Sequence, residues 1–185
     1  MRKLSYQEIF TRRPTVAQLE HISRYPMYCL LENVRSLYNV GSIFRTSDAV
    51  LLRRLYLTGY TGSPPRKEID KTALGATDTV EWAYVKNPLQ VIAELKKEKV
   101  TIVALEHTSA SKVYYDFKFN FPFCLLLGNE VDGLSAELIA STDAAIEIPM
   151  FGLKQSLNVS VAYGIVMYYA IGQYLSEQVH KENDR

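Results

Sequence analysis

Two short runs, Thr101–Leu105 and Phe121–Leu127, are apolar on both faces of a strand. Strands buried on both sides are typical of a parallel sheet that helices cover. Strand-like and helix-like segments alternate along the rest of the chain. This alternation predicts an α/β domain built on a mainly parallel sheet flanked by helices. No internal repeat or second domain is evident, so we expect residues 1–185 to form a single domain.

Periodicity and turn residues give approximate limits for the elements. We expect one or two short polar helices at 5–24, within an N-terminal helical extension, 1–24. Other helices are expected at 39–51, 89–99, 135–141 and 159–178, and strands at 27–32, 54–58, 100–105, 121–128 and 144–148. Glycine, proline and charge predict an exposed, mobile loop at 59–71. The charged end, 179–185, predicts a frayed tail.

Charge and cysteine content restrict the functions open to the chain. A net charge of +1 argues against binding nucleic acid by bulk charge, although basic pairs such as Arg66-Lys67 allow local contacts. Cys29 and Cys124 lie in apolar runs and predict buried free thiols, which favours a reducing, cytoplasmic compartment. Metal-ligand spacing is missing from the sequence, so we expect no bound metal.

The last predicted helix, 159–178, lacks a clean polar face. The uncharged stretch 155–176 carries too many polar residues to cross a membrane, so we expect no membrane association. A helix that is apolar all round is buried all round, and a small domain cannot easily cover its own terminal helix. We therefore expect a second copy of the chain to cover part of it in a two-fold homodimer. Coverage by the N-terminal helices is the alternative.

Three segments set polar side chains and glycines against an apolar run. The first, residues 33–46, reads NVRSLYNVGSIFRT. At about 100° per residue its apolar side chains form one helical stripe, and Arg45 lies roughly opposite, so Arg45 should project from the domain. Gly41 allows another backbone or a ligand to approach closely. Asn39 stands where a helix N-cap would stand.

The second segment, residues 125–134, reads LLLGNEVDGL. It ends a buried strand and then turns, placing Glu130 and Asp132 at the carboxyl end of that strand. Open α/β sheets place their ligands at this end. A purely structural interpretation also exists, in which the segment is a polar turn and Ser135 caps the next helix.

The third segment, residues 148–160, reads IPMFGLKQSLNVS and joins a predicted strand to the last helix. Its proline and glycine are typical of a turn in the chain. Ser156 or Asn158 could serve only as the cap of the last helix. Taken alone, this segment does not distinguish a functional site from an ordinary connection.

In their order and spacing, the three segments resemble the signature motifs of the SpoU/TrmH branch of the SPOUT RNA methyltransferases, and the resemblance covers roughly residues 25–175. It implies an α/β fold with a C-terminal trefoil knot, a dimer, and S-adenosylmethionine as cofactor. It also implies transfer of a methyl group to a ribose 2′-hydroxyl of tRNA or rRNA. Knots are rare exceptions to the usual topology, so this expectation comes from the resemblance alone.

The resemblance also implies the site residues. Arg45 would generate or stabilise the attacking alkoxide, beside a cofactor bound mainly by the other subunit, and would bind RNA together with Arg35. Asn39 and Ser156 would position Arg45 and the RNA phosphate, whereas Glu130 and Asn158 would hold the loops. The implied cofactor residues are Leu105, Glu106, Gly128, Ile148, Met150 and Leu157.

Two further functions stay open at this point. One is an RNA-binding protein of the same fold that has lost catalysis. The other is a small α/β enzyme that uses Glu130 and Asp132 with a divalent metal. The role of Arg45 is also open: a free guanidinium is a poor base at neutral pH, so Arg45 acts either as a strongly perturbed base or as a cationic stabiliser.

Overall fold

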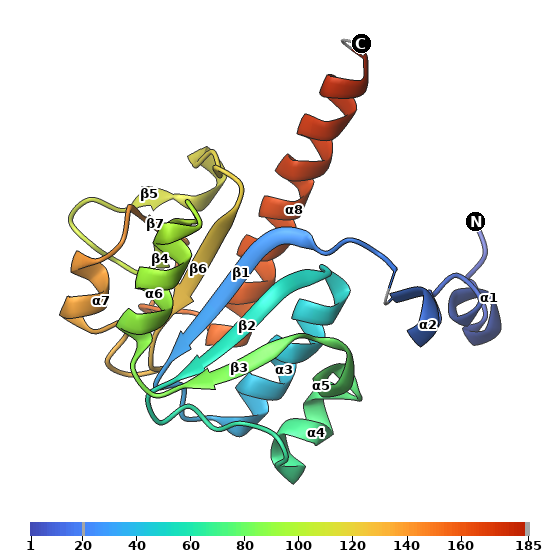
Figure 1. Ribbon diagram of the computed structural model, residues 1–185, viewed down its shortest axis with the longest axis horizontal. Coiled ribbons are helices and arrows are strands. Elements are labelled where there is room, and N and C mark those ends of the chain that lie inside the picture. The colour runs from blue at the N-terminus through green and yellow to red at the C-terminus, as the bar shows by residue number, and fades with distance from the viewer. Residues whose placement is uncertain (20, 184–185) are drawn as a thin grey trace.

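A seven-stranded parallel sheet forms the centre of the domain, with the strand order β3-β2-β1-β6-β4-β7-β5 (Figure 1). The computed structural model describes residues 1–19 and 21–183. The strands are β1 (Tyr25–Glu32), β2 (Leu52–Thr58), β3 (Trp82–Val85), β4 (Thr101–Leu105), β5 (Lys112–Val113), β6 (Phe123–Leu127) and β7 (Ala144–Glu147). All neighbouring strands pair in parallel, which confirms the predicted fold class.

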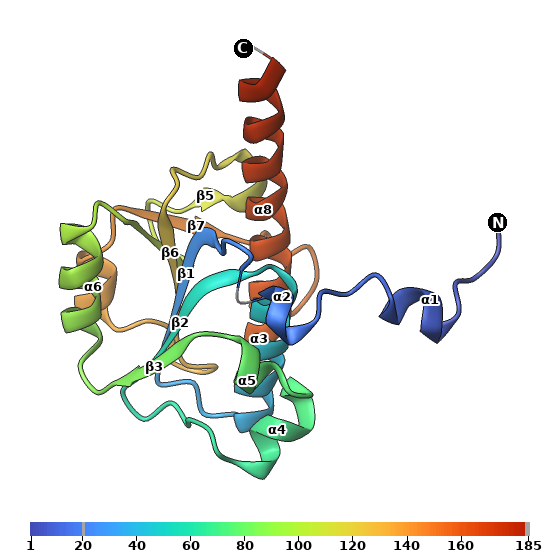
Figure 2. The same ribbon diagram turned by 45° about the vertical axis from the view of Figure 1, so that its right-hand side comes forward.

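Helices cover both faces of the sheet. The helices of the described chain are α1 (Tyr6–Phe10), α2 (Val16–Leu19), α3 (Leu37–Ala49), α4 (Lys67–Ala73), α5 (Ala76–Thr79), α6 (Pro88–Lys97), α7 (Ala136–Ala140) and α8 (Val159–Asn183), with a 3-10 turn at Tyr114–Asp116. Helices α6 and α7 lie on one face, and α3 and α8 lie on the other with α4 and α5 beside α3 (Figure 2). The sheet is therefore the middle of three layers.

The central strands feed both layers of the core. In β6, Leu125 and Leu127 pack under α3 and α8, whereas Cys124 and Leu126 pack under α6. All of these side chains are buried, because successive residues of a strand point to opposite faces. The sequence of β6 is continuously apolar because both faces of this strand are buried. Cys29 and Cys124 are buried and free, as predicted.

The sequence patterns missed four elements: β3, β5, α4 and α5. Helix α4 begins inside the stretch 59–71 that we expected to be a loop, so only its first part is irregular. Helix α3 begins at Leu37 with Ser36 as its N-cap, so Asn39 is not the cap. Helix α8 continues to Asn183, beyond the predicted end at 178 and through most of the expected frayed tail, whose last two residues lie outside the described chain.

We expected either a second copy of the chain or the N-terminal helices to cover α8, and the structure distinguishes between these two expectations. Helix α1 buries none of its residues, and Figure 1 shows both N-terminal helices lying to one side of α8. The alternative in which they cover it is therefore wrong within one chain. Exposed apolar side chains remain along α8 at Val161, Tyr168, Leu175 and Val179. None of the helices in the described chain is long and apolar enough to span a membrane.

Candidate functional site

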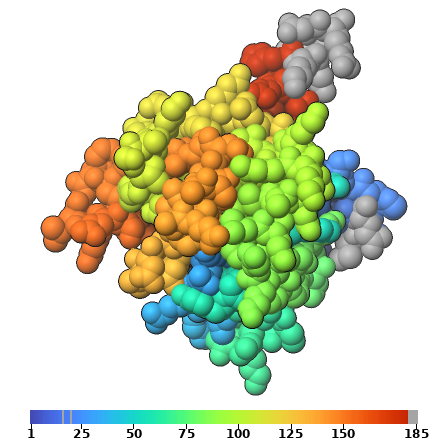
Figure 3. Space-filling model, turned by 60° about the vertical axis from the view of Figure 1, so that its left-hand side comes forward, coloured from blue at the N-terminus to red at the C-terminus, as the bar shows by residue number. Residues whose placement is uncertain are grey.

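A cleft of about 220 Å³ opens at the carboxyl ends of β4, β6 and β7. All six residues that we expected to bind a cofactor line it: Leu105, Glu106, Gly128, Ile148, Met150 and Leu157. Glu130 and Ser156 line it as well. Residues from three distant parts of the sequence thus meet where parallel sheets place their ligands. The loop that carries the third segment stands out as an orange lobe at the left of Figure 3.

Glycine makes the tight turn of the second segment possible. Asn129 and Gly133 exchange two backbone hydrogen bonds of 3.0 Å, which close a narrow hairpin after β6. A Cβ atom on Gly128 would lie 2.1 Å from the carbonyl carbon of Gly133. Gly133 itself has a φ of +69°, a conformation that favours glycine. The two strands of the hairpin can therefore pack backbone against backbone along one wall of the cleft.

Asn129 holds this hairpin against the first segment, a role that the sequence analysis did not assign. Its buried side-chain amide donates to the carbonyl of Asn33 at 2.9 Å and to the hydroxyl of Tyr60 at 2.8 Å. Its Oδ1 accepts from the backbone N–H groups of Val131 and Asp132. A buried amide with every group satisfied fixes the positions of the loops around it.

Glu130 ties the second segment to the start of α3. Its carboxylate accepts hydrogen bonds from the backbone N–H of Arg35 (2.9 Å), the backbone N–H of Ser36 (3.0 Å) and Nδ2 of Asn39 (3.0 Å). Partial burial acts to raise the pKa of Glu130, but the hydrogen bonds together outweigh it and hold the pKa below its usual value. Glu130 is therefore an ionised structural acceptor.

Asn39 and Asn158 join the third segment to the other two. Nδ2 of Asn158 donates to Oδ1 of Asn39 at 3.0 Å. Oδ1 of Asn158 accepts from the backbone N–H of Ser160 at 2.9 Å, so Asn158 also caps α8. The side chains of Glu130, Asn39 and Asn158 form one hydrogen-bonded chain across all three segments. The loop-holding that the resemblance implied for Glu130 and Asn158 stays a prediction, and these are the contacts through which it would act.

A polar cluster that the sequence analysis did not predict lies at another wall of the cleft. The Glu106 carboxylate accepts from the backbone N–H groups of Leu134 (2.9 Å) and His107 (3.0 Å). Nδ1 of His107 lies 3.5 Å from Glu147, which also accepts from Ser111. The Ser111 hydroxyl and then His107 lower the pKa of Glu147. In the sequence, His107 had no evident partner, because Glu147 lies far along the chain.

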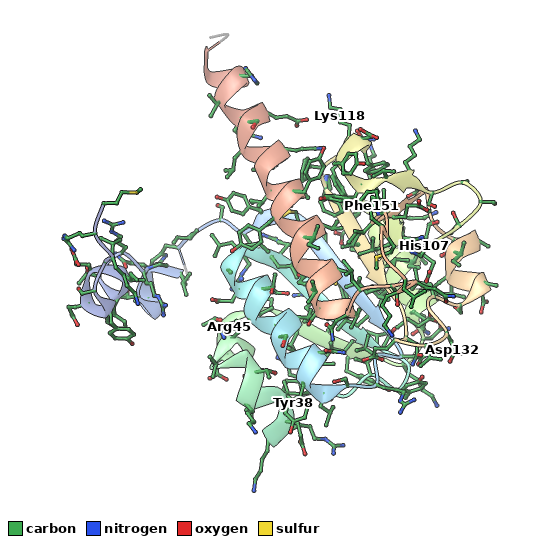
Figure 4. All side chains as sticks on the ribbon, turned by 180° about the vertical axis from the view of Figure 1, so that it is seen from behind. Tyr38, Arg45, His107, Lys118, Asp132 and Phe151 are labelled. Carbon is green, nitrogen blue, oxygen red and sulfur yellow. The ribbon has the colours of Figure 1, made fainter. Side chains whose placement is uncertain are left out.

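Arg45 does not line the cleft of its own chain. It lies on the exposed face of α3, and Figure 4 shows it on the other side of α8 from His107 and Asp132. Among residues 1–19 and 21–183, Arg45 makes no hydrogen bond or ion pair, so neither Asn39 nor Ser156 is hydrogen-bonded to it. Arg35 is also exposed. The positioning of Arg45 by Asn39 and Ser156 stays a prediction.

The metal-enzyme alternative gains no support from this geometry. The described chain holds no group of three or more His, Cys, Asp or Glu side chains that could bind a metal. The acceptors of Glu130 are taken by N–H donors. A carboxylate used in this way has little capacity left for a cation.

Three comparisons with known proteins agree with this arrangement. Residues 26–168 match the sequence model of the SpoU rRNA Methylase family. A tRNA (guanosine(18)-2′-O)-methyltransferase of Aquifex aeolicus is 36% identical over 143 residues, which are 75% of this chain and 65% of that protein. The chain thus spans slightly less than two thirds of this relative.

Solved structures share the fold at higher coverage. A TrmH/SpoU tRNA modifying enzyme of A. aeolicus superposes with a TM-score of 0.80 at 31% identity, covering 90% of this chain and 85% of that one. The SpoU methyltransferase AviRb of Streptomyces viridochromogenes, solved in complex with the cofactor AdoMet, superposes with a TM-score of 0.76 at 26% identity. That alignment covers 83% of this chain and 63% of AviRb.

Proposed function

We propose that this chain, which belongs to the SpoU rRNA methylase family, transfers a methyl group from S-adenosylmethionine to a ribose 2′-hydroxyl of tRNA or rRNA. The contact among the three segments carries the proposal. The second and third segments line the cleft, and Asn39 joins the first segment to them by direct hydrogen bonds to Glu130 and Asn158. The names of the relatives, which act on tRNA or rRNA ribose, support the same reaction.

The cleft suits S-adenosylmethionine chemically. Leu105, Ile148 and Met150 give it apolar walls, and the Gly128 hairpin gives a wall of main chain. Glu106, Glu147 and Asp132 line it, with His107 as the only basic side chain among the lining residues. Carboxylates favour a cationic sulfonium over a neutral thioether. When bound, S-adenosylmethionine would supply an activated methyl group.

In the proposed reaction, the ribose 2′-oxygen forms a bond to the methyl carbon as the carbon–sulfur bond breaks. Negative charge develops on that oxygen, and its proton passes to water. Arg45 stabilises this charge as a cation and hydrogen-bond donor. The guanidinium is exposed and has no carboxylate partner in the described chain, which favours the stabiliser over the base.

Completion of this site across a two-fold homodimer is part of the proposal. The exposed side chains on α8 recur at Val161, Tyr168 and Leu175, seven residues apart, and form one apolar stripe. Phe151 and Leu153, in the loop beside the cleft, are more than 90% exposed. A partner that packs on both surfaces would bring its Arg45 towards this cleft. Sedimentation velocity should give a dimer at micromolar concentration, and a monomer would contradict it.

RNA recognition is proposed for Arg35 and for the exposed basic residues around 59–71, which include Arg66 and Lys67. Phosphate contacts from such residues position the substrate and make binding depend on salt. The two buried thiols support a reducing compartment, the cytoplasm.

The test uses radiolabelled S-adenosylmethionine and total RNA from a strain that lacks the protein. We expect label in 2′-O-methylated nucleosides after nuclease digestion, with no loss on addition of a chelator. Titration calorimetry with the cofactor separates the alternatives. Cofactor binding without methyl transfer to any RNA, or no binding at millimolar cofactor, would favour the non-catalytic RNA-binding protein. Mapping the methylated positions that disappear in this strain identifies the nucleotide.

A further inference from the structure

Tyr38 and Lys71 form an exposed aromatic–cation pair close to the face of α3 that carries Arg45. Tyr38 is 47% exposed, and Nζ of Lys71 lies 5.9 Å from the centre of its ring. The attraction between an ammonium group and the face of a ring holds such pairs together. One member is on α3 and the other on α4, so the pair depends on how these helices pack.

The two helices are locked together at this point. The hydroxyl of Thr72 donates to the carbonyl of Tyr38 at 2.9 Å. A Cβ atom on Gly41 would lie 2.3 Å from the carbonyl oxygen of Ile69, so only glycine allows this approach. The close backbone approach expected at Gly41 is therefore that of α4. Because both backbones are fixed, Tyr38 presents its ring from a rigid base.

Tyr38 and Lys71 make few interactions with the rest of the protein. Within residues 1–19 and 21–183, the Tyr38 ring joins no other aromatic ring, its hydroxyl makes no hydrogen bond, and Lys71 forms no ion pair. Lys67 precedes Lys71 by one helical turn and is exposed on the same side of α4. A half-exposed ring beside an exposed lysine that forms no ion pair is a combination that can bind single-stranded nucleic acid.

Tyr38 also shares a helix face with Arg45. Seven residues separate them, which places them about 20° apart around α3 and about 10 Å apart along it. Figure 4 labels both side chains on this helix. Stacked nucleotides rise roughly 3.4 Å each, so Tyr38 stands about three stacked positions from a ribose held at Arg45.

We propose that Tyr38 and Lys71 form a subsite for substrate nucleotides that flank the methylated ribose. Tyr38 stacks on a base, and Lys71 contacts a phosphate of the same strand. This inference rests on the proposed function and adds a substrate requirement, an unpaired flanking base at a fixed distance. On and next to α3 and α4, exposed Arg35, Arg66, Lys67 and Lys71 outnumber the exposed acids Glu68 and Asp70, which favours a polyanion as the occupant.

The test compares Tyr38→Ala, Tyr38→Phe and Lys71→Ala with the unmodified chain, using total RNA from a strain that lacks the protein. Loss of stacking in Tyr38→Ala should raise the KM for RNA roughly 5- to 150-fold, whereas Tyr38→Phe keeps the ring and should change it little. Lys71→Ala should lower the dependence of KM on salt by about one phosphate contact. Cofactor affinity should stay unchanged in all three variants.

Tyr115→Ala is the matched control, because Tyr115 is 49% exposed and lies in the 3-10 turn directly after β5, the edge strand at the far end of the sheet from β3. An equal effect of Tyr38→Ala and Tyr115→Ala on the KM for RNA would overturn the proposal, as would an equal loss in Tyr38→Ala and Tyr38→Phe. Fluorescence anisotropy with end-labelled RNA from the same preparation gives an independent readout. If the unmodified chain transfers no methyl group, the proposed function fails, yet weaker RNA binding by Tyr38→Ala alone would still support the subsite.

Discussion

Asn39 and Asn158 lie 119 positions apart in the sequence, yet Nδ2 of Asn158 donates to Oδ1 of Asn39 at 3.0 Å. The other end of the Asn39 side chain donates to Glu130 at 3.0 Å. One amide therefore joins the turn after β6 to the start of α8. We expect this amide to help hold the cleft in shape, because its two neighbours belong to different loops.

Asn39→Ala removes both of these hydrogen bonds and leaves Asn158 and Glu130 with one partner fewer. We expect the free energy of unfolding to fall by about 1–3 kcal/mol, which corresponds to roughly 2–4 °C in Tm for each kcal/mol. Thermal unfolding followed by circular dichroism measures the change. Ser42→Ala, on the same helix, loses only a local bond to the carbonyl of Tyr38 and serves as the control. Equal Tm values for the two variants would contradict the joining role of Asn39.

Glu130 should make stability depend on pH. Because its folded-state pKa lies below the ordinary value, its contribution is fully present above the unfolded pKa of about 4.3. It is lost as the pH falls through the folded-state pKa. Urea unfolding between pH 7 and pH 3 should therefore show a loss of stability below about pH 4.3 that is smaller in Glu130→Gln. Identical pH profiles for the two proteins would show that Glu130 does not carry this linkage.

The sequence predicted the layered α/β fold because its central strands are apolar on both faces and alternate with amphipathic helices. It missed β3, a four-residue edge strand in which no residue is buried. It missed α4 because Pro64 and Pro65 precede the helix, and the cap residue Arg66 makes no capping hydrogen bond. Short elements of this kind are fixed by packing against their neighbours and not by local pattern.

The candidate site was predicted less evenly. The residues that line the cleft were predicted from the resemblance, which depends on the order and spacing of the three segments along the chain. The role of Asn129 in holding the hairpin against the first segment was not predicted. A sequence cannot show that one side-chain amide donates to both Asn33 and Tyr60. The pairing of His107 with Glu147 was missed for the same reason. Contacts between distant loops follow from the fold, and only the fold reveals them.

Gly128→Ala should weaken cofactor binding with little loss of overall structure. The added methyl would lie 2.3 Å from the backbone nitrogen of Leu134, so the hairpin at the cleft wall must move. We expect the Kd for S-adenosylmethionine, measured by titration calorimetry, to rise at least about tenfold, equivalent to roughly 1.4 kcal/mol. Gly152→Ala, where a Cβ meets no atom within 4 Å, is the control. Unchanged affinity in Gly128→Ala would place the cofactor elsewhere.

Arg45→Ala should abolish methyl transfer and leave cofactor affinity nearly unchanged. The side chain is exposed and contributes nothing to the cleft of its own chain. Loss of a group that stabilises the developing charge commonly costs roughly 100- to 1,000-fold in kcat. Single-turnover methyl transfer and calorimetry on the same preparation separate the two effects. A large loss of cofactor binding in Arg45→Ala would contradict the role assigned to this residue.

A mixture of Arg45→Ala and Gly128→Ala subunits tests whether the arginine acts on the partner's cofactor. In a heterodimer of the two, the Arg45→Ala subunit keeps a sound cleft and the Gly128→Ala subunit keeps the arginine. If the site is completed across the interface, each heterodimer has one intact site, and an equal mixture should recover about a quarter of unmodified activity in a two-fold dimer. The assay uses a cofactor concentration far below the Kd of Gly128→Ala, so that this variant alone transfers little. If each chain uses its own arginine, no intact site can form and the mixture shows no more activity than the average of its components. The apolar stripe on α8 supplies the internal control, because a third substitution at Tyr168 to glutamate in both chains should prevent pairing and abolish the recovery.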